Sequence, residues 1–183
     1  MILPTSFENS YRVVGFRTVD IECLYVRLWF FDKSRAKYVP IIKTPHYFFA
    51  LNVLKGEIPH PVQSVSEYHN YKKNEYAIHN PNNPNSFAKK PEEKIVRLVN
   101  SIKANGYNWQ MHPIFVSRHW KRPLPFGRWD VLDGVHRLAV LAALGESKIK
   151  VCLLGYKDSS LKRLLNRLGG IYLKKWKLGP GGG

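Results

Sequence analysis

The first 56 residues of the chain alternate between hydrophobic and polar positions in the manner of β-strands. Residues 11–16, 21–31 and 37–43 are rich in Val, Ile, Tyr, Phe and Trp, and polar breaks separate them. Within residues 21–31, strongly hydrophobic side chains alternate with more polar or aromatic ones. This alternation predicts a strand with one face on a core and the other partly in water. Residues 46–54 would suit a strand or a short helix, and we favour the helix. The pattern predicts a β-rich N-terminal extension over residues 1–58, packed on the rest of the chain.

The chain changes character between Pro59 and Pro91. Turn-forming residues cluster at His60-Pro61 and over residues 80–85, and the stretch between them, Tyr68–Tyr76, is polar and aromatic. This pattern predicts a long connection. Long ordered connections often carry function, although a plain surface loop fits the same sequence.

Helical and extended patterns then alternate. Pro91 opens the clearest amphipathic helix, in which Ile95, Leu98, Val99 and Ile102 share one face, and Asn105-Gly106 ends it. Residues 112–117 and 129–132 are predicted to be short strands, residues 137–144 an apolar helix, and residues 148–154 a further strand. The mixture indicates an α+β protein.

The charge of the chain indicates an anionic partner. Twenty-nine Lys and Arg against thirteen Asp and Glu give a net charge of +16 and a pI near 9.9. Such an excess attracts nucleotides, nucleic acid, anionic lipid or acidic polymers without choosing among them. Residues 157–183 are predicted to form a basic helical tail with a disordered glycine-rich end. The tail could contact a membrane surface or a partner, or it could pack on the core with a solvated basic face.

The two cysteines, Cys23 and Cys152, lie in apolar runs and suggest neither a disulfide framework nor a zinc site. The N-terminus lacks the pattern of a signal peptide, and no apolar run reaches the roughly 18–20 residues of a membrane span. We therefore expect a cytoplasmic protein.

The segment Asp133-Gly134-Val135-His136-Arg137 joins a predicted strand directly to a predicted helix. The first backbone N–H groups of a helix have no intrahelical acceptor, and the helix dipole favours an anion there. Gly134 allows a sharp turn, while Arg137 and His136 can donate hydrogen bonds to a phosphate. Asp133 would either cap the helix or hold a metal ion or hydroxyl beside the phosphate. An ordinary capped helix with a solvated His and Arg is the alternative.

The order of elements around this pentapeptide resembles the ParB/sulfiredoxin superfamily over roughly residues 76–156. That order is an amphipathic helix with an Asn-Gly stop, a short strand with Pro113-Ile114, a variable hairpin, a strand, the Asp-Gly-Val-His-Arg turn, an Ala/Leu helix and a strand. The resemblance implies a nucleotide-binding core over residues 59–156, with a small mixed sheet and helices.

Members of this superfamily bind ATP or CTP with the phosphates on this turn. By resemblance, Gly134, His136 and Arg137 would hold the phosphates. The family's contacts at i, i+3 and i+7 of the preceding helix fall on Lys94, Arg97 and Ser101, although Arg97 departs from the usual small hydroxyl residue. Val135 occupies the position of the sulfiredoxin cysteine, so sulfinic-acid reduction is excluded for want of a thiolate.

The Asp-Gly-x-His-Arg turn looks most similar to the free-serine-kinase branch. There a carboxylate near the start of the first helix acts as general base, and Mg²⁺ helps to carry the phosphates. Glu92, Glu93 and Glu75 are candidates for that base, and we favour Glu92; Asp133 is fixed by the motif as a metal ligand or acid/base group, beside His136. The acceptor would lie between this turn and residues 80–90, near His79.

The resemblance therefore implies an ATP- and Mg²⁺-dependent kinase that acts on the hydroxyl of a small molecule such as an amino acid or a sugar. The alternative is a nucleic-acid-binding or nuclease-like ParB relative that uses the basic residues of 118–128 and of the tail. The Gly-Glu-Arg-Arg-like turn of partition proteins is missing, and no helix-turn-helix DNA reader is expected after Tyr156.

Overall fold

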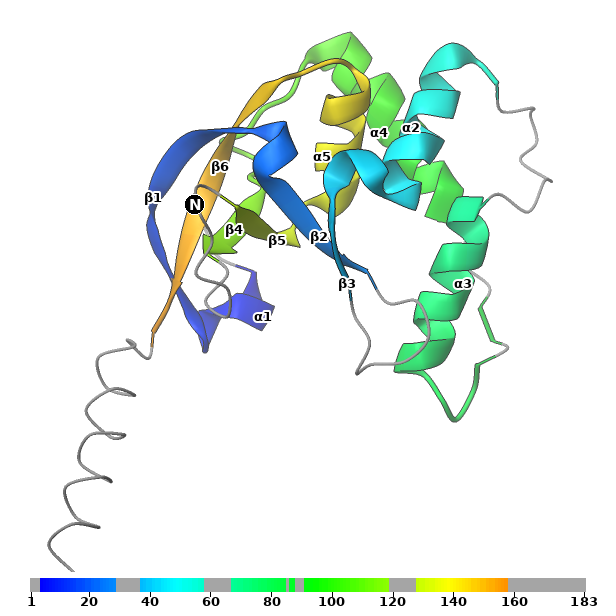
Figure 1. Ribbon diagram of the computed structural model, residues 1–183, viewed down its shortest axis with the longest axis horizontal. Helices are drawn as coiled ribbons and strands as arrows, with labels where there is room; N and C mark the ends of the chain where they lie inside the picture. The colour runs from blue at the N-terminus through cyan, green and yellow to red at the C-terminus, as the bar shows by residue number, and fades with distance from the viewer. Residues whose placement is uncertain are drawn as a thin grey trace, which may run out of the picture. The chain divides into compact units, whose positions relative to one another are not determined.

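The computed structural model (Figure 1) describes residues 4–28, 37–57, 67–84, 86–87, 91–118 and 128–157. The described residues divide into two compact units, one within residues 14–154 and the other formed by residues 4–13 and 155–157. The basic tail beyond Lys157, and the residues of 118–128 other than Arg118 and Arg128, lie outside the described residues, so the expectations for these two segments stay predictions.

The strands of the described residues form one six-stranded mixed sheet in the order β1-β6-β4-β5-β2-β3. Strand β2 pairs in parallel with β5 and antiparallel with β3, while β4 pairs antiparallel with β5 and in parallel with β6. The N-terminal strands therefore belong to the same sheet as the strand that leads into Asp133. The strands are β1 (Tyr11–Asp20), β2 (Leu24–Leu28), β3 (Lys37–Pro40), β4 (Phe115–Arg118), β5 (Trp129–Asp133) and β6 (Lys148–Tyr156).

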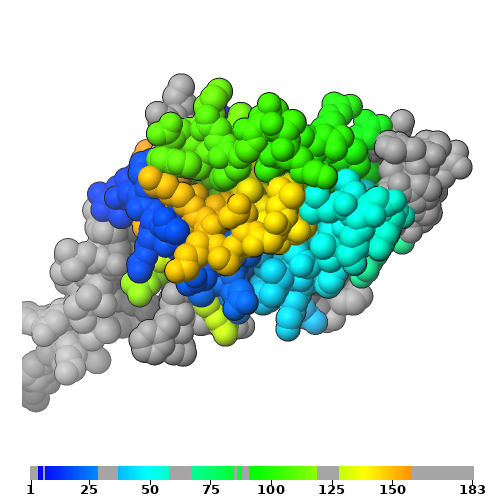
Figure 2. Space-filling view, turned by 90° about the horizontal axis from the view of Figure 1, so that it is seen from above, coloured from blue at the N-terminus to red at the C-terminus, as the bar shows by residue number. Residues whose placement is uncertain are grey.

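Helices α2, α4 and α5 of the larger unit pack on one another beside the sheet (Figure 1), and in the space-filling view of Figure 2 α5 lies against both α4 and α2. The α-helices are α1 (Thr5–Glu8), α2 (Pro45–Lys55), α3 (Glu67–His79), α4 (Pro91–Asn105) and α5 (Val135–Ala143), and two short 3-10 helices cover Ile21–Cys23 and Ile41–Lys43. The prediction of an α+β protein with a small mixed sheet and helices is confirmed.

The core lies between one face of the sheet and these helices. Leu24, Val26 and Leu28 of β2 are buried, whereas Arg27 between them is exposed, as the alternating pattern predicted. Helix α5 is buried at Leu138–Leu141, and α4 contributes Ile95 and Val99 to the same cluster. Burial of α5 on several sides fixes the direction in which its N-terminus points.

Most predicted elements of the second half are confirmed within a few residues, and so is the helix expected at 46–54. The runs 21–31 and 37–43 differ, since each contains a 3-10 turn that the strand pattern did not reveal. For the second turn the cause is Thr44, whose Oγ1 donates to Ile41 O at 2.7 Å and accepts from Tyr47 N at 3.2 Å. The same hydroxyl thus closes one turn and caps α2.

Residues 59–91, expected to be a long connection, contain helix α3. Its buried positions are Tyr68 and Tyr71, three residues apart. A helix that buries tyrosines among charged neighbours shows little hydrophobic periodicity, because each buried ring carries a hydroxyl and counts as only partly apolar. Tyr71 donates to Glu75 Oε1 at 3.0 Å within the same helix.

The smaller unit is held by aromatic and backbone contacts. The ring of Tyr11 lies 5.7 Å from that of Phe7 and 4.6 Å from that of Tyr156, and Lys157 N donates to Ser10 O at 3.0 Å. In the part of the chain that the structure describes, no helix combines the length and the apolar character that a bilayer crossing requires.

Candidate functional site

The N-terminus of α5 forms directly at the end of β5. Gly134 is the N-cap residue, with φ 91° and ψ 16°, and Leu138 N donates to Gly134 O at 2.9 Å as the first bond of the helix. No side chain caps this end. The N–H groups of the first helical turn therefore have no intrahelical acceptor, and they carry the positive end of the helix dipole.

Gly134 is required here for two reasons. A positive φ of 91° is a conformation that residues with a Cβ atom rarely adopt. A Cβ atom at this position would also lie 2.9 Å from Ile114 Cγ1 and 3.2 Å from Ile114 Cα. The glycine thus lets β5 turn into α5 while Ile114, the residue just before β4, packs closely against the turn.

Asp133 does not cap α5, which corrects one of the two roles expected for it. Its Oδ2 lies 3.5 Å from Arg137 Nη2, one helical turn away, and half of the Asp133 side chain is exposed. The pair places a carboxylate and a guanidinium side by side at the start of the helix. Arg137 is the more enclosed of the two.

A pocket of about 540 Å³ opens at this helix end. Its volume lies within the range typical of sites for small molecules and cofactors. Six residues predicted from the sequence to form the site line it together: Lys94, Ser101, Asp133, Gly134, His136 and Arg137. They come from segments more than 30 positions apart, which the packing of α4 against α5 brings together.

Helix α4 separates the predicted residues by face. Lys94, Leu98 and Ser101 follow one another at i, i+4 and i+7 and line the pocket. Arg97 lies to the side, with 80% of its side chain exposed and its Nη2 3.1 Å from Glu93 Oε2. Arg97 lines only a more open depression next to the pocket. Lys94 and Ser101 line both the pocket and this depression.

Glu92, the favoured base, does not line the pocket. Its side chain is only 6% exposed, and its Oε1 lies 2.6 Å from Nδ1 of His69 on α3. Glu75 forms an ion pair with Lys72 and accepts the Tyr71 hydroxyl, while Glu93 pairs with Arg97. The pocket is therefore lined by one carboxylate among the described residues, that of Asp133.

His136 lies in the first turn of α5 and contacts α3. Its Nε2 and the hydroxyl oxygen of Tyr68 are 2.9 Å apart. Burial, reinforced by the positive charges of Lys94, Lys72 and Arg137, lowers the pKa of His136 to about 3. The ring is therefore neutral at physiological pH, and it can offer a phosphate one hydrogen bond but no charge.

Behind His136 lies a second histidine that sequence reasoning missed. The His46 ring, from α2, is 3% exposed and packs 5.2 Å from the His136 ring and 5.1 Å from the Tyr68 ring. Burial, then the nearby His136 and Lys72, lower the pKa of His46 well below its ordinary value. Its Nδ1 is buried without a hydrogen-bond partner in the described chain.

The segment between α4 and β4 supplies a further part of the pocket wall. Leu98 and Ile102 of α4 join Tyr107, Met111 and His112 in a mainly apolar and aromatic surface. Tyr107 donates to His112 O at 2.8 Å, and burial raises the pKa of Tyr107 to about 12. Asn108 Oδ1 accepts from the N–H groups of Gln110 and Met111, which stabilises the loop.

Sequence reasoning missed this wall because it treated Asn105-Gly106 as a helix stop only. The signal that could have revealed it is the stretch of aromatic and amide side chains over residues 105–112, which follows the helix that carries Lys94. Among the described residues, none of 79–84 and 86–87 lines the pocket, so the expected position of an acceptor near His79 stays a prediction.

Within the described residues, no three His, Cys, Asp or Glu side chains converge as a set of protein ligands for a metal ion. Asp133 is a single carboxylate at the pocket wall. Mg²⁺ at nucleotide sites is often held by one or two carboxylates together with the phosphates of the substrate. The residue present fits that mode of binding, in which the nucleotide itself would complete the coordination.

Comparison of the chain with protein-family models, with curated proteins and with solved structures found no match.

Proposed function

We propose that this protein binds a nucleoside triphosphate in the pocket at the N-terminus of α5, and that it is an ATP- and Mg²⁺-dependent phosphotransferase of the ParB/sulfiredoxin type. The observation that carries the proposal is the convergence of Lys94, Ser101 and the 133–137 turn on one pocket of suitable size. The reaction, phosphoryl transfer to a hydroxyl group, is proposed from the resemblance of the turn motif to the serine-kinase branch. ATP and CTP both fit this description.

The α5 end of the pocket suits the phosphates. Uncapped N–H groups, the guanidinium of Arg137 and the ammonium of Lys94 surround it, and each is a donor without acceptor capacity. The net positive charge there offsets the repulsion between phosphate oxygens. The apolar wall with Tyr107 and Met111 suits the face of a base, because aromatic and thioether groups pack on flat rings.

In the proposed reaction the acceptor oxygen bonds to the γ-phosphorus as the bond from that phosphorus to the ADP oxygen breaks. The proton of the acceptor hydroxyl passes to the Asp133 carboxylate, which lines the pocket where Glu92 does not. Mg²⁺ would neutralise charge on the phosphates beside Asp133. Arg137 and Lys94 hold the phosphates in place, so catalysis is mainly positioning and electrostatic stabilisation.

The first test is calorimetric titration of the full chain with ATP and with CTP, with and without Mg²⁺. Arg137→Ala removes a guanidinium that can bind phosphate with two hydrogen bonds, and we expect ATP binding to weaken by about 10–100-fold. Lys94→Ala should weaken it by about tenfold. Release of ADP with a panel of small hydroxyl compounds, free serine included, then tests the transfer step.

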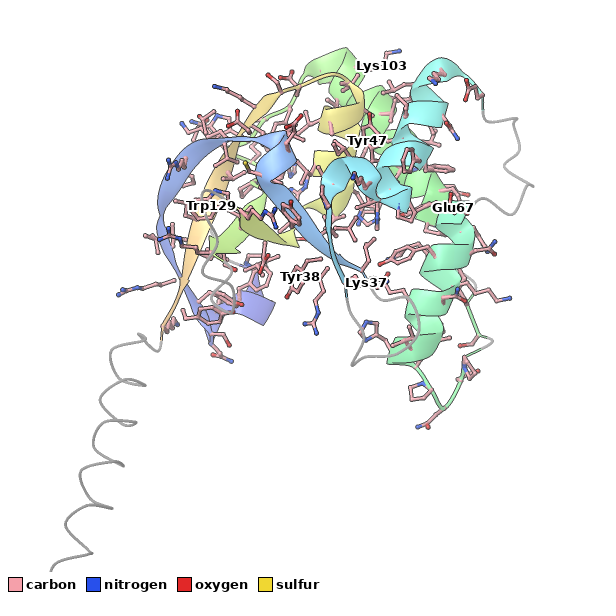
Figure 3. All side chains as sticks on the ribbon, in the orientation of Figure 1. Lys37, Tyr38, Tyr47, Glu67, Lys103 and Trp129 are labelled. Carbon is pink, nitrogen blue, oxygen red and sulfur yellow. The ribbon has the colours of Figure 1, made fainter. Side chains whose placement is uncertain are left out.

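Lys103→Ala is the matched control for Lys94→Ala. Lys103 is an exposed lysine near the end of the same helix, labelled in Figure 3, and it does not line the pocket. Its removal should leave ATP affinity within about twofold, because an exposed charge outside the site is screened by salt. Equal losses in both variants would show only a general charge effect and contradict the assignment.

A failure of both ATP and CTP to bind would contradict the proposed function. Steeply salt-dependent binding of DNA or RNA by the same preparation would then support the alternative, a nucleic-acid-binding ParB relative.

A further inference from the structure

We propose that Tyr68 is a positioning residue that holds His136 in the tautomer with the proton on Nδ1, so that this nitrogen donates a hydrogen bond to an anion at the N-terminus of α5. The inference rests on the proposed function for the identity of the anion. It concerns a tyrosine from α3, a segment that does not line the pocket itself.

The hydrogen bond between Tyr68 and His136 admits two arrangements. Either the tyrosine O–H donates to an unprotonated Nε2, or a protonated Nε2 donates to the tyrosine oxygen. The two arrangements place the imidazole proton on opposite ring nitrogens. They therefore make the other nitrogen, Nδ1, a donor in the first case and an acceptor in the second.

The surroundings of Tyr68 favour the first arrangement. Its side chain is 1% exposed, and His136 Nε2 is the one acceptor for its hydroxyl among the described residues. If Nε2 donated instead, the tyrosine O–H would be buried without an acceptor, at a cost of about 1–3 kcal/mol. Burial and the charges of Glu75 and Glu92 raise the pKa of Tyr68, so the hydroxyl keeps its proton.

The remaining nitrogen of His136, Nδ1, is the one that can serve a ligand. His136 lines the pocket, and its Nδ1 has no hydrogen-bond partner among the described residues. The one fully buried side-chain nitrogen or oxygen without a partner in that part of the chain is His46 Nδ1, so His136 Nδ1 is open to solvent. A neutral ring with a proton on Nδ1 would add a donor to the N–H groups of the helix, whereas a bare Nδ1 would repel an anion.

The decisive measurement is the tautomer of His136 in the full chain without nucleotide. Two-bond ¹H–¹⁵N correlation spectra separate a protonated from an unprotonated ring nitrogen, and His136→Gln assigns the signals. We expect a proton on Nδ1 in the wild type. Tyr68→Phe should shift the ring toward a mixture of the two tautomers and weaken ATP binding by about tenfold.

Tyr71→Phe is the matched control, because the Tyr71 hydroxyl donates to Glu75 from the same helix. It should change neither the His136 tautomer nor ATP affinity. His136→Asn gives a second variant, since the side-chain amide nitrogen of Asn stands at the same distance from Cβ as Nδ1. It should keep more affinity than His136→Gln, and it should be insensitive to an added Tyr68→Phe.

A wild-type ring protonated on Nε2 would overturn the inference, and so would full ATP affinity in a folded Tyr68→Phe variant. If the wild type binds no nucleotide, the proposed function fails and inorganic phosphate becomes the probe. Movement of the His136 Nδ1 signal during a phosphate titration would then support the inference, and an unmoved signal would overturn it.

Discussion

At the scale of single residues, the start of α5 depends on Gly134. The left-handed backbone and the close approach of Ile114 both exclude a larger residue. Gly56, Gly106 and Gly145 share only the first constraint. Gly145, beyond the other end of α5, has φ 89° and nothing within 4 Å of a Cβ atom placed there.

Gly134→Ala is therefore expected to lower the free energy of unfolding by about 2–5 kcal/mol, through backbone strain and overpacking together. Gly145→Ala should cost only about 1–2 kcal/mol, because it adds the strain alone. Urea denaturation of both variants gives the comparison. Equal losses would mean that the contact with Ile114 relaxes freely, and the close approach would then not constrain the turn.

At the scale of elements, α4 serves the core and the pocket from different faces. Ile95 and Val99 are buried, Lys94, Leu98 and Ser101 line the pocket, and Glu92 reaches His69 of α3. The contact of Glu92 with His69 joins α4, which carries Lys94 at the pocket, to α3, which carries Tyr68, the hydrogen-bond partner of His136. We therefore assign Glu92 to the packing of α3 on α4.

Glu92→Ala should lower the free energy of unfolding by about 2 kcal/mol, since a charge-assisted hydrogen bond is lost and His69 is left without this carboxylate. ATP affinity at a temperature well below the unfolding midpoint should change by less than about threefold, because Glu92 does not line the pocket. Denaturation and calorimetry on the same sample measure both quantities. A variant of normal stability that has lost phosphoryl transfer would restore Glu92 as the general base.

At the scale of the whole molecule, two neutral histidines make stability depend on pH. The pKa of His136 is lowered to about 3 and that of His46 well below its ordinary value, so the unfolded chain binds protons that the folded chain does not. The difference in bound protons between the unfolded and the folded chain grows as the pH falls through about 6.5, the pKa of an unperturbed histidine. His46 is enclosed by His136, Lys72, Tyr68 and Tyr71, and none of these supplies a negative charge.

The free energy of unfolding should therefore be greatest above pH 7 and fall between about pH 6.5 and pH 5, before most carboxylates titrate. Urea denaturation at closely spaced pH values measures this slope. His46→Phe keeps an aromatic ring and removes one of the two titrating groups, so its slope in this interval should be shallower. An unchanged slope in that variant would exclude His46 as a source of the pH dependence.

The sequence by itself determined most helices and strands and the strand-to-helix turn at 133–137. These features depend on neighbours along the chain: the apolar spacing of α4, the Asn-Gly stop and the glycine between β5 and α5. Lys94 and Ser101 were named by the resemblance, and their spacing along one face of α4 is local information, but their meeting with the 133–137 turn required the packing of α4 against α5.

Only the tertiary structure decided which faces of those elements meet. It turned Glu92 toward His69 and Arg97 toward solvent, and it enclosed His46 and Tyr68 behind His136. It also showed that the tyrosine-rich stretch at 67–79 is a helix, and that strands from both halves of the chain share one sheet. The physical reason is that burial and hydrogen bonds between distant segments depend on packing, which local periodicity does not encode.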